Sequence, residues 1–183
     1  MSEFLREITE VRENADLIYD EVAMTACYDH LAEKITENLI DNRPLFLPVM
    51  MGGIYLCGQL MQRLDFPLEV DYLHATRYRD KLQGNDLHWL VHPSGKVAGR
   101  TVLVIDDILD QGLTLAGIVE NLQKAGAAEV QSVVLTVKQC PRIKDVDVTY
   151  RGVDVPDRYV FGCGMDYRGY WRNLPQIYAV ADS

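Results

Sequence analysis

Three carboxylates lie close together at Asp106, Asp107 and Asp110, where an apolar run ends and a glycine-containing loop begins. The full stretch, residues 102–115, is VLVIDDILDQGLTL. Adjacent carboxylates at the end of a strand can accept hydrogen bonds from vicinal sugar hydroxyls or hold Mg²⁺ through water. The same pair could instead only stabilise a helix N-terminus, an effect of roughly 0.3–1 kcal/mol. Spacing alone does not separate these two uses.

The loop that follows the carboxylates has the features of a phosphate site. Gly112 allows close approach of the backbone, and the amides of residues 110–114, together with the Thr114 hydroxyl, can point at one anion at a helix N-terminus. It is not a Walker loop. Residues 53–58 are GIYLCG, but Gln59 and Leu60 stand where Lys and Ser or Thr are required.

Hydrophobic periodicity predicts the elements that must position this loop. We expect helices over residues 24–39, 54–64 and 115–125, and strands at 45–49, 67–73, 101–105, 130–137 and 157–161. Strands that alternate with helices are typical of a parallel sheet. In such sheets ligands bind outside the carboxyl ends of the strands, and residues 106–114 occupy that position.

The periodic pattern breaks between residues 77 and 100, where Gly84, Asn85 and Asp86 form a good turn between two short strand-like runs. We expect a flexible hairpin there. The chain is predicted to be a single domain over residues 1–183, with a lid loop at about 76–100 and a small lobe built from about 1–20 and 152–183.

Composition limits the classes of protein that remain. A chain of 183 residues with 48% hydrophobic and 25% charged residues is normal for one α/β domain. Its four cysteines have no metal-binding or disulfide spacing. No apolar run approaches the roughly 20 residues that span a bilayer, and the acidic, polar N-terminus is unlike a signal peptide, so we expect a cytoplasmic protein without a membrane partner. The net charge of −9 also disfavours a nucleic-acid partner.

Three motifs in order resemble one family. VLVIDDILDQGLTL is similar to the phosphoribosyl pyrophosphate signature of type I phosphoribosyltransferases, and Asp110 as first loop residue is most similar to the hypoxanthine-guanine branch. VMMGG at 49–53 resembles the family's pyrophosphate loop, and YVFGCGMDYRGYWRNLP at 159–175 resembles its base-binding and C-terminal block. The resemblance runs from about residue 20 to 180.

The resemblance implies both a fold and an activity. The fold is a doubly wound α/β domain with a mainly parallel five-stranded sheet, helices on both faces, a small lobe and a lid. The activity is Mg²⁺-dependent purine salvage, in which hypoxanthine or guanine reacts with phosphoribosyl pyrophosphate to give IMP or GMP and pyrophosphate. Relatives are usually dimers or tetramers, so a homodimer or homotetramer is expected.

Roles carry over to the matching residues. Asp110 would take or share the purine proton, a contribution typically worth about 10² to 10⁴ in rate. Phosphoribosyl and phosphate contacts fall to Asp106, Asp107, Gln111, Gly112, Leu113 and Thr114, and pyrophosphate contacts to Met51, Gly52, Gly53 and Arg172. The purine would meet Lys138, Tyr159, Val160 and Asp166, the metal would meet Asp106, Asp107 and Asp166, and the lid would contribute Arg77 and Tyr78.

Several positions depart from the family pattern or carry a special expectation. Lys138 would donate to a 6-oxo group and thereby reject adenine, which offers no acceptor there. The Met50–Met51 bond is the candidate for the family's cis peptide. Met51 stands where many relatives have Lys, Leu113 where a basic residue is frequent, and Arg77 where a small hydroxyl residue is common.

Two other classes of function stay open. A nucleotide-sensing, RNA-binding regulator of the same fold would need a basic face, whereas this chain is acidic and has no Lys/Arg cluster outside the predicted lid and C-terminal block. A flavodoxin-like binding module would explain the fold but not the three motifs.

Overall fold

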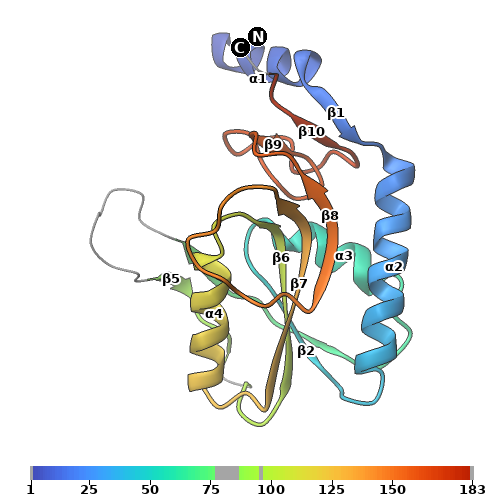
Figure 1. The fold of residues 1–183 in the computed structure, drawn as a ribbon, viewed down its shortest axis with the longest axis vertical. Helices are drawn as coiled ribbons and strands as arrows, with labels where there is room; N and C mark the ends of the chain where they lie inside the picture. The colour runs from blue at the N-terminus through green and yellow to red at the C-terminus, as the bar shows by residue number, and fades with distance from the viewer. Residues whose placement is uncertain (1, 77–86, 95–96, 182–183) are drawn as a thin grey trace.

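A five-stranded parallel sheet forms the centre of the molecule (Figure 1). The computed structural model describes residues 2–76, 87–94 and 97–181. In spatial order, the strands are β3 (Glu69–Val70), β2 (Leu45–Pro48), β6 (Thr101–Leu109), β7 (Glu129–Lys138) and β8 (Tyr150–Val155). All neighbouring pairs in this sheet are parallel. Parallel strands covered on both faces appear as continuous apolar runs, which is why 45–47 and 102–105 could be predicted as strands.

Helices cover both faces of the sheet, as predicted. The helices α2 (Glu21–Leu39) and α3 (Gly53–Met61) lie on one side and α4 (Leu113–Lys124) on the other (Figure 1). Successive residues of a strand point to opposite faces. Accordingly, Phe46 and Leu103 pack in the core cluster with α2 and α3, while Leu47 and Val104 pack in the cluster with α4. The fold is therefore the doubly wound α/β arrangement that the sequence indicated.

A second, three-stranded antiparallel sheet lies at one end of the molecule, near both termini (Figure 1). Its order is β1 (Asp16–Tyr19), β10 (Ile177–Ala179) and β9 (Val160–Phe161). The helix α1 (Glu3–Asn14) joins it and was not predicted, because its sequence is polar and buries only Ile8. The indole N–H of Trp171 donates to the carbonyl of Ile8 (2.9 Å) and ties this helix to the C-terminal segment.

The prediction that residues 157–161 form the fifth strand of the main sheet is wrong. That position belongs to β8, and β9 pairs with β10 instead. The reason is that β8 is an edge strand, so its sequence YRGVDV keeps polar residues and has no continuous apolar run. The predicted lobe began at residue 152, yet residues 152–155 lie within β8; the division into lobe and lid stays a prediction.

Other boundaries shift in ways that matter for the site. The strand predicted at 67–73 is limited to the edge strand β3. By contrast, β6 continues past Ile105 to Leu109, so both Asp106 and Asp107 are strand residues. Of the two strand-like runs predicted around the turn, the second contains β5 (His88–Val91), which pairs with β4 (His74–Thr76), a strand that precedes the predicted hairpin. The first run lies outside the described residues. The turn at 84–86 lies outside the described residues, as do Arg77 and Tyr78.

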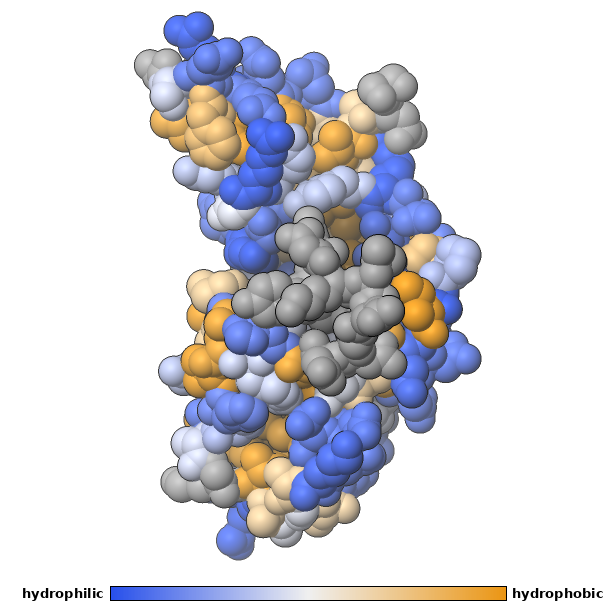
Figure 2. All heavy atoms as spheres, turned by 90° about the vertical axis from the view of Figure 1, so that its left-hand side faces the viewer, coloured by the Kyte–Doolittle hydropathy of each residue, from blue (hydrophilic) through white to orange (hydrophobic). Residues whose placement is uncertain are grey.

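The surface carries hydrophobic side chains interspersed with hydrophilic ones on the face shown in Figure 2. Within the described part of the chain, no helix combines the length and the apolar character needed to cross a bilayer.

Candidate active site

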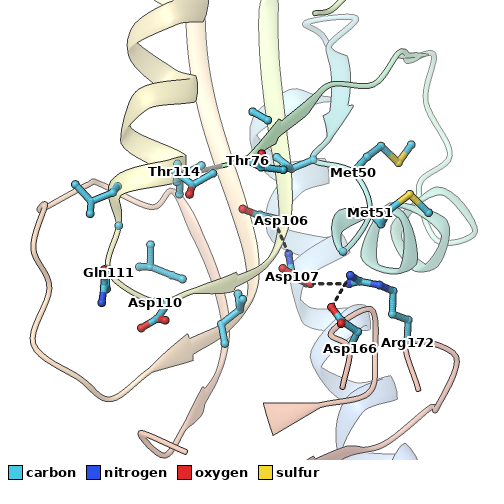
Figure 3. Close-up of a pocket in the computed structure, with 18 residues that line it drawn as sticks. Met50, Met51, Thr76, Asp106, Asp107, Asp110, Gln111, Thr114, Asp166 and Arg172 are labelled. Atoms are coloured by element: carbon cyan, nitrogen blue, oxygen red, sulfur yellow. Dashed lines mark hydrogen bonds and ion pairs between the residues drawn. The ribbon is translucent and has the colours of Figure 1, made fainter. Parts of the chain in front are cut away.

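Two cavities meet at the carboxyl ends of the strands. The larger, of about 660 Å³, is lined by residues 49–52, 75–76 and 106–115 together with Asp166 and Arg172 (Figure 3). The smaller, of about 210 Å³, is lined by Lys138, Tyr159, Val160 and Met165 and shares Asp107, Ile108, Asp110 and Asp166 with the larger one. The shared residues make the two cavities neighbouring parts of one site.

Most residues singled out from the sequence line these cavities. Those in the larger cavity are Met51, Gly52, Asp106, Asp107, Asp110, Gln111, Gly112, Leu113, Thr114, Asp166 and Arg172. The expected purine contacts Lys138, Tyr159 and Val160 are in the smaller one. Gly53 lines neither cavity. Its N–H donates to the carbonyl of Val49 (2.9 Å) at the start of α3, so that amide is already used within the protein.

The phosphate loop depends on Gly112. This residue has φ +80° and precedes the first residue of α4, and a β-carbon there would overlap the carbonyl of Lys144. The Lys144 N–H in turn donates to the carbonyl of Gln111 (3.1 Å). The left-handed conformation and the close approach both favour glycine. The loop thus directs the N-terminus of the 12-residue α4 toward the cavity, where the first helical amides can bind an anion.

The pair Asp106 and Asp107 is largely buried at the cavity wall. The Asp107 N–H donates to Oδ1 of Asp106 (3.0 Å), and the side chain of Asp107 is only 14% exposed. Burial raises the pKa of both carboxyls, and the neighbouring charge of Asp107 raises the pKa of Asp106 further. The pair is therefore poised to gain a cationic or hydrogen-bonding ligand.

Arg172 is the cationic side chain among the described residues that line the larger cavity. Its Nη2 lies 2.5 Å from Oδ1 of Asp166 and its Nη1 lies 3.7 Å from Oδ2 of Asp107 (Figure 3). Nη1 also donates to the carbonyl of Gly164 (2.6 Å). Since the cavity also contains Asp106 and Asp110, its carboxylates outnumber its cations. An anionic ligand would therefore need additional positive charge.

Magnesium fits the donors that face this cavity. In the described residues, no group of three or more His, Cys, Asp or Glu side chains is arranged to hold a metal ion by itself. Mg²⁺, however, is commonly bound by one or two carboxylates together with substrate phosphates and water. Asp106 and Asp107 offer such oxygen donors, whereas Asp166 is already paired with Arg172 and accepts from the Gly169 N–H (2.6 Å).

Asp110 lies on the boundary between the two cavities. It is exposed, and its Oδ1 accepts a hydrogen bond from the Cys140 thiol (3.2 Å). Burial, followed by this hydrogen bond, raises the pKa of Cys140. The sequence showed only that the cysteines lack metal-binding or disulfide spacing, and it gave no indication of this contact. No local signal could have revealed it, because the two residues are 30 positions apart.

Some residues that line the cavities were given no role from the sequence. Ala75 and Thr76 line the larger cavity and belong to none of the three motifs. Ile108 and Met165 also line the cavities, and although both lie within motifs, the sequence assigned them no role. A separate expectation concerned one peptide bond. The Met50–Met51 peptide bond, which the family resemblance named as the candidate, is cis.

Comparison with known proteins agrees with the geometry. A family model described as a phosphoribosyl transferase domain matches residues 14–168. The hypoxanthine-guanine-xanthine phosphoribosyltransferase of Tritrichomonas foetus is 33% identical over 154 residues, which cover 84% of each chain. The hypoxanthine-guanine phosphoribosyltransferase of Bacillus subtilis (strain 168) is 32% identical over 148 residues, covering 80% of this chain and 82% of the relative.

Solved structures give the same picture. A hypoxanthine-guanine-xanthine phosphoribosyltransferase superposes with a TM-score of 0.85 at 29% identity, covering 93% of this chain and 99% of the other. A hypoxanthine phosphoribosyltransferase from Staphylococcus aureus superposes with a TM-score of 0.87 at 25% identity, covering 93% of this chain and 94% of the other.

Proposed function

The chain belongs to the phosphoribosyltransferase family, in its type I hypoxanthine-guanine branch, and on that premise we propose that it is a purine salvage enzyme. The reaction joins hypoxanthine or guanine to phosphoribosyl pyrophosphate and yields IMP or GMP and pyrophosphate. One observation carries the proposal: Asp110 lines both the cavity with the phosphate loop and the cavity with Lys138. A carboxylate at this boundary suits a reaction that joins a base to a phosphoribosyl group.

The larger cavity would hold phosphoribosyl pyrophosphate. The N-terminus of α4, with Gly112 and Thr114, would bind the 5′-phosphate. Arg172 would donate to pyrophosphate oxygens, since a guanidinium offers five N–H donors and can hold two oxygens at once. Mg²⁺ bound by Asp106 and Asp107 together with substrate oxygens would neutralise the negative charge of the leaving pyrophosphate.

The smaller cavity would hold the purine. Lys138 is a pure donor at the end of β7, so it would recognise the 6-oxo group of hypoxanthine and guanine and find no acceptor on adenine. Tyr159 would stack on the ring, and the carbonyl of Val160 would accept from its far edge. As the ring nitrogen forms its bond to C1 of the ribose, Asp110 would take or share the proton on the five-membered ring.

Assembly and location are further parts of the proposal. Exposed hydrophobic side chains on α3 and near β3, namely Ile54, Met61, Val70 and Tyr72, offer apolar surface for association into a homodimer or homotetramer. Sedimentation would measure the oligomeric state. The cytoplasmic location stays a prediction.

A panel of bases tests the proposed reaction. The enzyme, phosphoribosyl pyrophosphate and Mg²⁺ are incubated with hypoxanthine, guanine, xanthine, adenine or uracil, and nucleotide formation is measured. We expect turnover with hypoxanthine and guanine and none with adenine or uracil. The absence of turnover with both 6-oxopurines would refute the proposal.

The role of Asp110 has its own test. Asp110→Asn should lower kcat by at least about tenfold, because a general base typically contributes about 10² to 10⁴, while the KM for phosphoribosyl pyrophosphate changes little. Asp145→Asn is the matched control, since Asp145 is also an exposed aspartate but lines neither cavity. Full turnover by Asp110→Asn at saturating substrate would remove Asp110 from the role of base.

A further inference from the structure

A carboxylate outside the matched motifs pairs with the lysine of the smaller cavity. Nζ of Lys138 lies 3.5 Å from Oδ1 of Asp157. Asp157 does not line either cavity, and neither the spacing nor the resemblance singled it out. Its contact with Lys138 arises from the pairing of two parallel strands.

The strand register explains why these residues meet. Lys138 is the last residue of β7 and is paired with Val155, the last residue of β8. The N–H of Gln139 donates to the carbonyl of Val155 (2.9 Å) and extends the ladder by one step. Asp157 follows Val155 by two residues, so its side chain reaches the ammonium from the neighbouring strand end.

The segment that carries Asp157 is held in place on its far side. The N–H of Arg158 donates to the carbonyl of Pro156 (2.8 Å), and its Nη2 donates to Oδ2 of Asp16 and to the carbonyl of Val180 (both 2.6 Å). The Val180 N–H donates to the carbonyl of Tyr159 (2.8 Å). The position of the Asp157 backbone is therefore determined by β1 and β10, immediately before the two residues expected to contact the purine.

The lysine needs such a partner. Its side chain is 17% exposed, and an ammonium on a flexible four-carbon stem can adopt many positions unless something restrains it. Losing water also costs free energy that a nearby negative charge offsets. An ammonium has three N–H donors, so an ion pair that engages one side of it with Asp157 still leaves donors for a ligand.

We propose that Asp157 is a positioning residue that holds the ammonium of Lys138 toward the 6-oxo group of the purine. This inference rests on the proposed function and adds a residue to its base recognition. The contrasting explanation is an ordinary surface ion pair, because Asp157 is 59% exposed and exposed pairs contribute little to stability. A surface pair would not affect the KM for one substrate selectively.

The test compares Asp157→Asn with a matched control. Asp154→Asn removes a carboxylate of β8 that is 64% exposed and lies 3.7 Å from Nη2 of Arg151, so it takes away an ion pair of the same strand that does not include Lys138. We expect Asp157→Asn to raise the KM for hypoxanthine and guanine about three- to tenfold, the loss typical of one hydrogen bond, with little change in the KM for phosphoribosyl pyrophosphate. Asp154→Asn should leave all KM values unchanged, and Asp157→Glu should recover part of the loss.

A double-mutant cycle asks whether Asp157 acts through Lys138. In a Lys138→Met background, Asp157→Asn should cause no further increase in the KM for the base. An equal increase in both backgrounds, or an unchanged KM in Asp157→Asn, would overturn the positioning role. These outcomes require that the unaltered enzyme turns over hypoxanthine or guanine. Its failure to do so would refute the proposed function itself, so the two failures are distinguishable.

Discussion

Gly52 lies so close to Asp107 that a β-carbon on Gly52 would overlap the carboxyl group of Asp107. The loop before α3 and the end of β6 thus pack with no side chain between them. Asp107 is confined on this side by backbone and on the other by Arg172, whose Nη1 lies 3.7 Å from its Oδ2 (Figure 3). The glycine therefore contributes to the position of a carboxylate that we expect to contact substrate.

Gly52→Ala should lower the transferase activity by about a hundredfold, since a displacement of about 1 Å in a catalytic group can have that effect. The backbone of Gly52, at φ −63° and ψ −44°, accommodates alanine without strain, so the effect would come from displacement of Asp107. Gly58→Ala is the control: it lies in α3, its added β-carbon meets nothing within 4 Å, and alanine stabilises a helix by roughly 0.5–1 kcal/mol. Full activity in Gly52→Ala would contradict the assigned importance of Asp107.

Gly112→Ala should impair both stability and activity, because the φ of +80° is unfavourable for alanine and its β-carbon would overlap the Lys144 carbonyl. Gly99→Ala separates the two causes, since Gly99 also has a positive φ, +72°, but an added β-carbon meets nothing within 4 Å. The backbone strain alone costs about 1–3 kcal/mol. Denaturant unfolding should show a larger loss of stability, and kinetics a larger loss of activity, for Gly112→Ala than for Gly99→Ala. Equal losses in the two variants would show that the contact with Lys144 is unimportant.

Asp106→Asn should stabilise the metal-free protein at neutral pH while reducing activity. The folded-state pKa of Asp106 is raised above its unfolded value, so the unfolded chain releases the proton first as pH rises. Stability therefore decreases with rising pH from the unfolded pKa, about 4, up to the folded pKa. We expect the variant to melt about 2–4 °C higher at pH 7, the shift that about 1 kcal/mol produces in a protein of this size.

The same difference should disappear as the pH falls below about 4, where the Asp106 carboxyl is protonated in both the folded and the unfolded state of the unaltered protein. Thermal melts in EDTA across this pH range measure it, with the exposed Asp145→Asn as control. A variant that melts lower than the unaltered protein at pH 7 would show that Asp106 stabilises the fold as an anion.

The sequence was sufficient to predict those parts of the fold whose residues are buried on both faces of the sheet. The stretch from Val102 to Ile105 is fully buried between helices, so its apolar run predicts a central strand and the position of the acidic pair at its end. Gly112 was singled out because glycine allows close approach of the backbone, and in the structure it directly precedes α4. These signals are local, and they correctly predicted that the phosphate loop and its carboxylates lie together.

The missing parts depend on contacts between distant residues. The edge strand β8 is covered on one face and carries Arg151 and Asp154, so its composition does not indicate a strand. The partners of Lys138 and Asp110 are set by the register of β7 with β8 and by the course of the chain after β7. Such neighbours cannot be inferred from the spacing of residues along one segment.

The contact between Cys140 and Asp110 predicts that chemical modification of the Cys140 thiol lowers the transferase activity. The Cys140 thiol donates to Oδ1 of Asp110 (3.2 Å), and a group added to its sulfur would both remove that proton and crowd the carboxylate. Cys57 and Cys163 are buried, and burial raises the pKa of each to about 11, so neither should compete for an alkylating reagent at moderate pH. Cys140 is the accessible thiol whose modification would reach the proposed base.

Iodoacetamide should therefore inactivate the enzyme in a pH-dependent manner. Because the pKa of Cys140 is raised, its reactive thiolate is scarce at neutral pH, and the rate of inactivation should increase about tenfold per pH unit below that pKa. Cys140→Ser retains a donor to Asp110 and should keep most of the activity while resisting the reagent. Cys27→Ser, at a partly buried thiol whose pKa is about 11, should remain sensitive. Equal inactivation of Cys140→Ser and the unaltered enzyme would show that another residue is the target.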